Sequence, residues 1–378
     1  MNTLHLNTHL DPGGISTYIE TLGKALMKKG HRVSVLSGGG SKIPSFEQSG
    51  IRCFSFPIRT KSELHPKLFL SLPRIASQIR LEKFDILHAH TRVTQVLAFW
   101  LGQITDLPFV STAHGFYKAR FGRKIFPCWG ERVVAVSSLV AEELQNLHRI
   151  PTSKITVVNN AIDIEDFEKR LRHQNPNEIR AKNGIPKNAF VIGCISRLVR
   201  DKGQEYLIEA VSRLKQQIPD LFLVLVGDGR EKTRLESLIM KLDLNSRVRI
   251  LSGLQETTTI LPAIDVFVHP ATYREGFGLA IVEALVAKKP VILTKIPALE
   301  TLFEQNINAV LVSPKDSEAL ADAIFDFFQH PEKAKQIAER GHEMVSTLCR
   351  AERQAEEMER IYKEVLDCFA RKKTVGSQ

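Results

Sequence analysis

Two acidic residues eight positions apart, Glu275 and Glu283, enclose a stretch of glycine and apolar residues. The first follows an apolar run at 265–270 that is typical of a buried strand, and the second lies in the first turns of the helix expected next. From Phe277 onward, the start of that helix offers backbone amides without partners inside the helix. Carboxylates at both ends with bare amides between them suit a ligand that has hydroxyl groups at its ends and phosphate in the middle. A capping carboxylate beside a packing glycine is the simpler alternative.

A basic loop follows another expected strand, at 189–194. The loop reads SRLVRDKG and places Arg197 and Lys202 ahead of a helix. An arginine fork grips two oxygens and a lysine adds a point charge, so the pair suits a diphosphate and can stabilise negative charge that develops on a leaving group. A solvated basic loop without a ligand is the alternative.

Glycines and a histidine mark strand ends in the first half of the chain. Gly13 and Gly14 follow the first expected strand and precede a helix, where backbone amides can approach a phosphate. A tight turn has the same pattern, and neither a GxGxxG fingerprint nor a Walker loop occurs. His114 stands between an expected strand and a glycine, which favours a functional position over a purely structural one.

The elements that carry these residues alternate between short apolar runs and longer helical patterns, which is typical of α/β units with parallel sheets. A first series is followed by a charged, asparagine-rich segment with proline and glycine, and a second series then begins. Six strands are expected in the second series, at 189–194, 221–226, 247–251, 265–270, 290–294 and 309–312. The sequence therefore predicts two doubly wound domains. The expected bounds are 1–165 for the first domain, 166–188 for a linker, 189–350 for the second domain, and 351–378 for a C-terminal helix with a basic tail.

Composition narrows the class of protein. The chain has 378 residues, 43% hydrophobic and 25% charged, which excludes low-complexity disorder and a disulfide-rich miniprotein. No apolar run approaches the ~20 residues that span a bilayer, and the start of the chain shows no secretory signal, so we expect a cytoplasmic protein. The five cysteines are scattered without CxxC spacing, which argues against a zinc site.

The net charge of +10 is concentrated in the first domain. Residues 1–165 carry 20 Lys and Arg against 12 Asp and Glu, a net charge of +8, whereas the other residues carry 32 against 30. This asymmetry favours an anionic partner for the first domain, such as nucleic acid, phospholipid or a phosphorylated substrate.

Taken together, the early Gly-Gly loop, SRLVRDKG, the VGDG motif at 226–229 and the Glu275 to Glu283 stretch resemble the retaining glycosyltransferases of family 4. The resemblance extends over nearly the whole chain and includes the Asn-Ala-Ile-Asp junction at 160–163 and Glu300. It implies the GT-B fold, in which two Rossmann-like domains face a central cleft and a C-terminal helix straps back to the first domain. It also implies an enzyme of the hexosyltransferase type that uses a UDP- or GDP-sugar donor, retains the anomeric configuration and needs no metal or other cofactor.

The roles implied by the resemblance are these. Glu275 would bind hydroxyl groups of the donor sugar, Glu283 would bind the ribose, and His114 would reach the sugar near the reacting carbon. Arg197 and Lys202 would clamp the diphosphate, and the backbone at 251–254 would cradle the base. The resemblance thus assigns catalysis to Arg197, Lys202, Glu275 and His114, and donor binding to Gly13, Gly14, Gly227, Leu251, Leu254, Phe277, Gly278, Leu279 and Glu283. The chain departs from the family pattern at Ala161, at Pro297-Ala298 and at Lys288-Lys289.

The acceptor is bound by the first domain in this family, where basic residues are interleaved with aromatic ones. Such a mixture suits the surface of an anionic membrane, since rings enter the interface and cations meet lipid head groups. An acceptor-cleft wall with ordinary core aromatics is the alternative. The residues assigned to an acceptor or membrane face are Arg59, Lys61, Arg92, Lys118, Arg120, Arg123 and Lys124. His88 and His90 alternate at a strand end and could line the acceptor side, whereas His269 is expected to pack or to bond within its loop.

The predicted function is transfer of a sugar from a nucleotide-diphosphate donor to a hydroxyl of a glycan or lipid-linked acceptor, at the inner face of the cell membrane. The expected pathway is the synthesis of cell-surface polysaccharide, lipopolysaccharide or glycolipid. A sugar-nucleotide epimerase with the same architecture is an alternative, but it would not require paired glutamates or a basic acceptor domain. A nucleic-acid-binding protein would explain the charge, yet no recognised binding motif is present.

Overall fold

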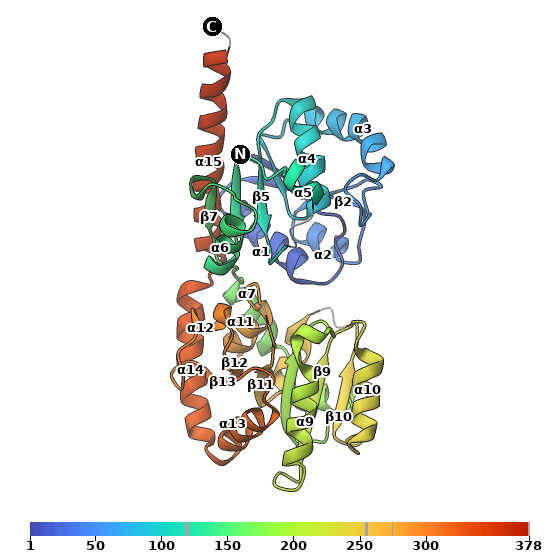
Figure 1. The fold of residues 1–378 in the computed structure, drawn as a ribbon, viewed down its shortest axis with the longest axis vertical. Helices are drawn as coiled ribbons and strands as arrows, with labels where there is room; N and C mark the ends of the chain where they lie inside the picture. Colours follow the sequence, from blue (N-terminus) through green and yellow to red (C-terminus); the bar gives the residue numbers. More distant parts are fainter. Residues whose placement is uncertain (118–120, 254–255, 274, 377–378) are drawn as a thin grey trace. The chain divides into compact units, whose positions relative to one another are not determined.

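The computed structural model of the protein describes residues 1–117, 121–253, 256–273 and 275–376. The chain forms two compact units. Unit 1 consists of Met1–Asp163 and Ala351–Gln378, and unit 2 consists of Ile164–Arg350. Each unit is built around one parallel β-sheet with helices packed on its faces (Figure 1).

The sheet of unit 1 has the strand order β3-β2-β1-β4-β5-β6-β7. Parallel neighbours require crossover connections, and helices supply them between the strands. The order reverses between β1 and β4, which are paired with His5 opposite His88. The strands are β1 (Asn2–Leu6), β2 (Arg32–Ser37), β3 (Arg52–Ser55), β4 (Ile86–Ala89), β5 (Phe109–Ala113), β6 (Arg132–Ala135) and β7 (Ile155–Val157).

Both faces of this sheet are buried, and the side chains of successive strand residues point to opposite faces. Leu4 and Leu6 of β1 belong to an apolar cluster with α3 and α4, whereas His5 points to the opposite face, where α1 and α15 pack. The helices are α1 (Gly14–Lys28), α2 (Ile43–Gln48), α3 (Pro66–Glu82), α4 (Arg92–Thr105), α5 (Phe121–Ile125), α6 (Ser138–Asn146) and α15 (Ala351–Gly376), with a 3₁₀ turn η1 (Thr152–Lys154) before β7.

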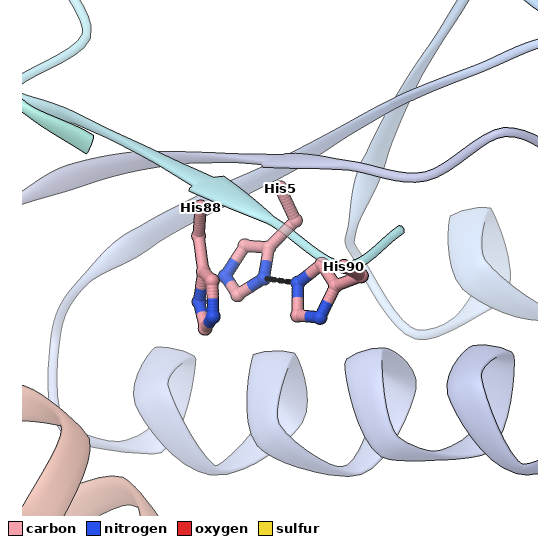
Figure 2. Close-up of side chains that lie close together, drawn as sticks. All are labelled: His5, His88 and His90. Carbon is pink, nitrogen blue, oxygen red and sulfur yellow. Dashed lines mark hydrogen bonds between the residues drawn. The ribbon is translucent and has the colours of Figure 1, made fainter. Parts of the chain in front are cut away.

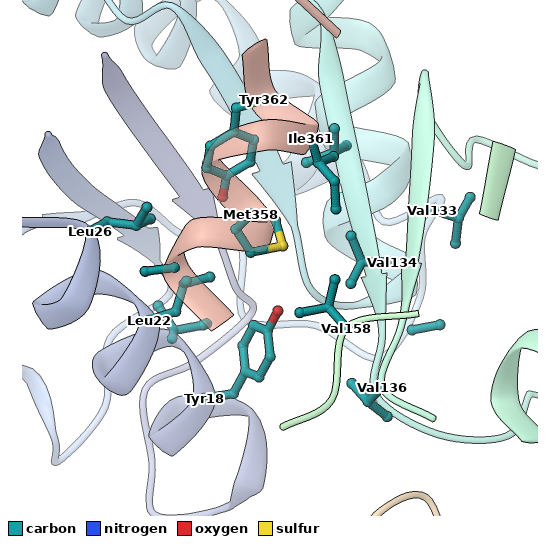
Figure 3. Packing of buried hydrophobic residues seen from close by; sticks show 14 of the residues in the cluster. Tyr18, Leu22, Leu26, Val133, Val134, Val136, Val158, Met358, Ile361 and Tyr362 are labelled. Carbon is teal, nitrogen blue, oxygen red and sulfur yellow. The ribbon is translucent and has the colours of Figure 1, made fainter. Parts of the chain in front are cut away.

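The C-terminal helix α15 is part of the core of unit 1. Met358, Ile361 and Tyr362 recur at helical spacing, are fully buried, and face α1 and β6 (Figure 3). The helix also extends through the segment expected to be a basic tail, because ion pairs hold its last turns. Lys372 pairs with Glu131 at 2.8 Å, and Lys373 pairs with Asp106.

The sheet of unit 2 has the order β10-β9-β8-β11-β12-β13, so its switch point lies between β8 and β11. Its strands are β8 (Phe190–Ile195), β9 (Leu221–Val226), β10 (Val248–Leu251), β11 (Val266–His269), β12 (Val291–Thr294) and β13 (Val310–Val312). Its helices are α7 (Ile164–Arg172), α8 (Pro176–Lys182), α9 (Gln204–Leu214), α10 (Lys232–Lys241), α11 (Leu279–Val286), α12 (Pro297–Glu300), α13 (Ser317–Gln329) and α14 (Pro331–Leu348), and its 3₁₀ turns are η2 (Arg200–Lys202), η3 (Thr257–Thr259) and η4 (Leu261–Ala263).

The segment 166–188, which the sequence suggested as a linker, contains α7 and α8 and groups with unit 2. Its charged residues are not all solvated. Arg180 donates to Asp265 at 3.0 Å, and the same oxygen of Asp265 accepts the amide of Val191 at 2.7 Å. This polar segment therefore forms helices, and Asp265 connects the second of them to β8, the first strand of the unit 2 sheet. Within the described residues, no helix is both long enough and apolar enough to cross a membrane.

Candidate active site

The carboxyl edge of the unit 2 sheet brings together the residues predicted to bind a diphosphate sugar. Arg197 and Lys202 follow β8, and Glu275 follows β11. These two strands are neighbours at the switch point, where doubly wound sheets bind their ligands. The topology thus places the two predicted cations and the first predicted acid at one edge of the sheet.

Glu275 lies at the centre of a hydrogen-bonded group at this edge of the sheet. Its Oε2 accepts the ammonium group of Lys202 and lies 2.7 Å from Nε2 of His269. Its Oε1 accepts the amide of Gly276 at 3.1 Å. The side chains of Glu275, Lys202 and His269 are only 12%, 14% and 3% exposed. The loop bond expected for His269 is thus made to the central carboxylate.

The protonation state of Glu275 follows from these contacts. Burial on its own would raise the pKa of this carboxyl group. The hydrogen bond from His269 and the charges of His269 and Lys202 outweigh burial and hold the pKa of Glu275 well below its usual range. The carboxylate is therefore ionised at physiological pH and acts only as a hydrogen-bond acceptor, which suits a role in orienting hydroxyl groups.

Close backbone approach fixes the loop after β8 against the loop after β11. Gly203 has a φ of +65°, and a Cβ atom there would lie 2.0 Å from the carbonyl oxygen of Pro270. The amide of Thr272 also donates to the carbonyl of Asp201 at 2.9 Å. The buried side chain of Gln204 donates to Ser196 at 2.8 Å and braces the start of the same loop.

The loop after β9 packs against the loop after β8. A Cβ at Gly227 would lie 2.0 Å from the carbonyl oxygen of Ser196, and the amide of Gly227 donates to the carbonyl of Leu251 at 2.9 Å. Arg197 is exposed on this edge, and within the described ranges its guanidinium has no hydrogen-bond or ion-pair partner. The loops after β8, β9 and β10 therefore contact one another at this sheet edge, where the predicted donor-binding residues lie. Leu254 lies outside the described residues.

The start of α11 has the form expected for an amide-lined site. Gly278 precedes the helix with a φ of +78°, and no side chain caps the first turn among the described residues. Phe277 is buried, whereas Leu279 and Glu283 are half-buried. The first amides of the helix are thus flanked by Glu275 on one side and Glu283 in the second turn.

The predicted site residues of unit 1 also lie at the carboxyl edge of their sheet. Helix α1 begins at Gly14, and Gly13 is its N-cap residue. His114 directly follows β5, is half-buried, and places Nε2 3.0 Å from Nδ1 of His90. Burial lowers the pKa of His114 to about 3, so the ring is neutral at physiological pH.

The basic residues assigned to an acceptor or membrane face have different environments. Arg59 and Lys61 are exposed, and Arg59 pairs with Asp11 at 2.8 Å. Arg92 instead pairs with Glu63 and donates to the backbone carbonyls of 126 and 127. Lys124 lies on α5, and Lys118 and Arg120 lie outside the described residues.

Arg123 is buried rather than exposed. Its guanidinium lies 4.5 Å from the ring centroid of Tyr117 and 4.6 Å from that of Trp129. Cation–π contact accounts for a buried arginine that the composition suggested as a surface charge. Arg92 and Arg123 therefore anchor the loop around α5.

Comparisons with known proteins define the class of this protein. The model of Glycosyltransferase Family 4 matches residues 12–166, and that of Glycosyl transferases group 1 matches residues 175–344. The chain is 25% identical to the UDP-Gal:alpha-D-GlcNAc-diphosphoundecaprenol alpha-1,3-galactosyltransferase of Escherichia coli, over 77% of this chain and 79% of that protein. The fold is similar to a glycosyltransferase from Rickettsia africae ESF-5, with a TM-score of 0.80, 25% identity, and coverage of 97% and 98% of the two chains. It is also similar to HepE of Anabaena in complex with UDP and glucose, with a TM-score of 0.82, 22% identity, and coverage of 96% and 100%.

The chain therefore belongs to the group 1, family 4 glycosyltransferases. It is a glycosyltransferase with the two-domain GT-B α/β fold, which confirms the predicted fold class and enzyme class. This membership favours a transferase over the epimerase and nucleic-acid-binding alternatives.

Proposed function

We propose that this glycosyltransferase moves a sugar, with retention of configuration, from a nucleotide-diphosphate donor to a hydroxyl of a glycan or lipid-linked acceptor. The observation that carries the proposal is the ionised carboxylate of Glu275, held by Lys202 and His269 at the switch point of unit 2. An acceptor for sugar hydroxyls and a cation for phosphate are thereby fixed side by side.

The charges of this site suit breakage of the bond between the anomeric carbon and the diphosphate. Negative charge develops on the leaving phosphate, where Arg197, Lys202 and the first amides of α11 can stabilise it. The acceptor oxygen forms the new bond to the anomeric carbon on the same face, and its proton passes to an oxygen of the departing phosphate. Glu275 orients the sugar hydroxyls, Glu283 binds the ribose, and His114 contacts the sugar from unit 1.

The activity named for the Escherichia coli relative supports the donor and acceptor classes. That protein takes galactose from UDP-Gal to an acceptor linked to diphosphoundecaprenol. We therefore expect a UDP-sugar as the donor and a lipid-linked or cell-surface glycan as the acceptor, with the enzyme working at the inner face of the cell membrane.

Exposed apolar residues on unit 1 support the proposed lipid-linked acceptor. They lie on or beside α3, α4 and α5, and Leu70 is the most exposed, at 77%. The exposed cations Lys61, Lys67 and Arg74 accompany them. Exposed apolar side chains next to cations can bind an anionic membrane surface. Phe69 and Trp100 are in ring contact, with centroids 6.5 Å apart, and the set called the apolar patch below is Leu64, Phe69, Leu70, Trp100, Ile104 and Ile125.

A cavity of ≈ 410 Å³ adjoins the apolar patch, lined by residues of α4, the segment 126–131 and Phe369 of α15. Aromatic rings connect the two features. The ring of Phe99 lies 5.4 Å from that of Trp100 in the patch and 4.8 Å from that of Phe126 in the cavity wall. The hydrocarbon part of a lipid-linked acceptor could thus pass from the membrane surface into the cavity.

Calorimetric titration with UDP, GDP, ADP and their common sugar conjugates tests the donor site. We expect one nucleotide diphosphate to bind, and Glu283→Ala to weaken that binding about tenfold or more, because a charged hydrogen bond to the ribose is lost. Glu236→Ala, at an exposed position of α10, is the matched control. Failure of every nucleotide to bind would refute the proposed donor class.

A further inference from the structure

Four histidines of unit 1 converge where its strand order reverses. His5 on β1 lies opposite His88 on β4, and His90 and His114 directly follow β4 and β5. Figure 2 shows the rings of His5, His88 and His90 close together. Burial lowers the pKa of His5 and His114 to about 3 and holds the pKa values of His88 and His90 well below the usual range. Each ring is therefore neutral, with one N–H and one lone pair.

Three of these rings form a hydrogen-bonded chain. Nδ1 of His5 lies 2.9 Å from Nε2 of His90, and Nδ1 of His90 lies 3.0 Å from Nε2 of His114. A neutral imidazole donates through only one nitrogen, so the direction of one bond fixes the direction of the other. His88 stands outside the chain, because its two nitrogens bond to the hydroxyls of Tyr362 and Thr112, each at 2.7 Å.

The buried end of the chain determines its direction. Nε2 of His5 is buried and has no hydrogen-bond partner in the described part of the molecule. If His114 donated to His90 and His90 donated to His5, the proton of His5 would be on Nε2. This nitrogen would then be a buried N–H without an acceptor, a group that folded proteins rarely contain. If His5 donates to His90 and His90 donates to His114, Nε2 of His5 carries only a lone pair. A buried acceptor without a donor costs less than a buried N–H without an acceptor.

We propose that His5 and His90 are positioning residues that fix His114 in the tautomer with its proton on Nδ1. His5 donates from Nδ1 to His90, and His90 donates from Nδ1 to Nε2 of His114. The Nδ1–H of His114 is then left as a donor for a ligand. The identity of that ligand rests on the proposed function, which makes it an oxygen of the donor sugar. His114 thus orients the sugar by donating a hydrogen bond and does not act as a base.

A metal site is the other use that such a cluster suggests. One ring nitrogen from each of His5, His88 and His90 lies within 4.8 Å of the other two. However, both nitrogens of His88 and both nitrogens of His90 are engaged in hydrogen bonds. A metal ion would have to break several of these bonds to gain three ligands, so the arrangement favours the proton chain.

Long-range ¹H–¹⁵N spectra of the full-length, ¹⁵N-histidine-labelled protein at pH 7.5 test the tautomer directly, with His114 assigned from the His114→Gln variant. We expect the proton of His114 on Nδ1 in the wild-type protein. In His90→Phe we expect it on Nε2, the form that free histidine favours in water. His90→Asn keeps an amide donor near the position of Nδ1 and is expected to keep the wild-type tautomer.

A proton on Nε2 of His114 in the wild-type protein would overturn the proposal, and so would an unchanged tautomer in His90→Phe. The wild-type spectrum decides the direction of the chain even if that variant does not fold. Sugar transfer provides the second measurement. We expect kcat/KM to fall about tenfold in His90→Phe, as for one lost hydrogen bond, and His90→Asn to recover most of the loss.

The two measurements separate the proton chain from the proposed function, because the spectra need no substrate. The predicted tautomer in a protein that transfers no sugar would refute the proposed function alone. The opposite tautomer in an active enzyme would refute the proton chain alone.

Discussion

Nε2 of His269 lies 2.7 Å from Oε2 of Glu275, the same oxygen that accepts the ammonium group of Lys202. The contact joins the end of β11 to the loop that follows it. The bond from Lys202 connects the loop after β8 to the same carboxylate. The acid expected to bind the sugar and the cation expected to bind the phosphate are therefore held in one rigid group. Such preorganisation is what lets fixed charges stabilise a transition state without reorganisation.

Replacing either Arg197 or Lys202 is expected to slow the chemical step. Arg197→Ala and Lys202→Met should each lower kcat about 10²-fold or more, because they remove positive charge where the leaving diphosphate becomes negative. Steady-state kinetics with the donor identified by titration would measure the effect. Lys241→Ala, an exposed lysine at the end of α10, is the matched control. Near-wild-type turnover in both variants would contradict the assigned roles.

Removal of divalent metal is expected to leave sugar transfer unchanged. Under the proposed function, Arg197, Lys202 and the first amides of α11 would meet the negative charge of the diphosphate, so we expect no requirement for a cation from solution. The test is kcat after dialysis against EDTA. A loss of activity that Mg²⁺ restores would count against this prediction.

The strands of unit 2 could be predicted closely, and the reason is physical. Strands of a parallel sheet are buried on both faces, so they appear as uninterrupted apolar runs. The run expected at 221–226 is β9 (Leu221–Val226), and the run at 189–194 is shifted by one residue from β8 (Phe190–Ile195). The sites that follow these strands could therefore be placed on one sheet edge from the motifs alone.

Long-range contacts of polar residues could not be predicted in this way. His5 sits in the apolar first strand, and its partner His90 is 85 residues away, so no local pattern marks the pair. Arg123 reads as a surface charge in the sequence, yet two aromatic rings enclose it. Similarly, the hydrogen bond from Arg180 to Asp265 holds α8 in a segment whose polar composition suggested a linker. These contacts depend on tertiary structure, which composition and periodicity do not encode.

The C-terminal helix is expected to be essential for the stability of unit 1. Met358→Ala should lower the free energy of unfolding by about 2–5 kcal/mol, because Met358 is fully buried between α15 and the sheet. Glu356→Ala, at an exposed position of the same helix, should have little effect. Both tryptophans, Trp100 and Trp129, lie in unit 1, so urea unfolding followed by their fluorescence reports on this unit. Equal unfolding midpoints for the two variants would contradict the predicted contribution of Met358.

Binding to anionic vesicles is expected to depend on the apolar patch of unit 1. Leu70→Asp should weaken sedimentation with vesicles that contain phosphatidylglycerol, because an apolar contact is lost and a negative charge faces the lipid. Met240→Asp is the matched control, since Met240 is similarly exposed, at 68% against 77% for Leu70, but lies in unit 2. Binding should also weaken as salt is raised. If the wild-type protein did not sediment with these vesicles at low salt, the proposed membrane contact would be lost.

Unit 1 is expected to lose stability in mild acid. The six histidines with lowered pKa values are His5, His31, His88, His90, His114 and His148, all in this unit. Burial is the main cause in each case. Below the ordinary histidine pKa of about 6.5, the unfolded chain binds protons that the folded unit excludes, so the free energy of unfolding falls as the pH falls. Each such histidine contributes to this loss until its folded pKa is reached, which is about 3 for His5 and His114.

Urea unfolding followed by tryptophan fluorescence at pH 7.5 and pH 5.5 measures this dependence, and the midpoint should be clearly lower at pH 5.5. His114→Gln should reduce the difference between the two midpoints, because one excluded proton is removed. His173→Gln, at an exposed position of unit 2, should leave the difference unchanged. Glu275 does not contribute in this range, since its pKa is lowered and its ionised form persists well below pH 5. A midpoint that does not change between pH 7.5 and pH 5.5 would mean that the buried histidines take up protons in the folded unit, and the neutral proton chain through His90 would then be wrong as well.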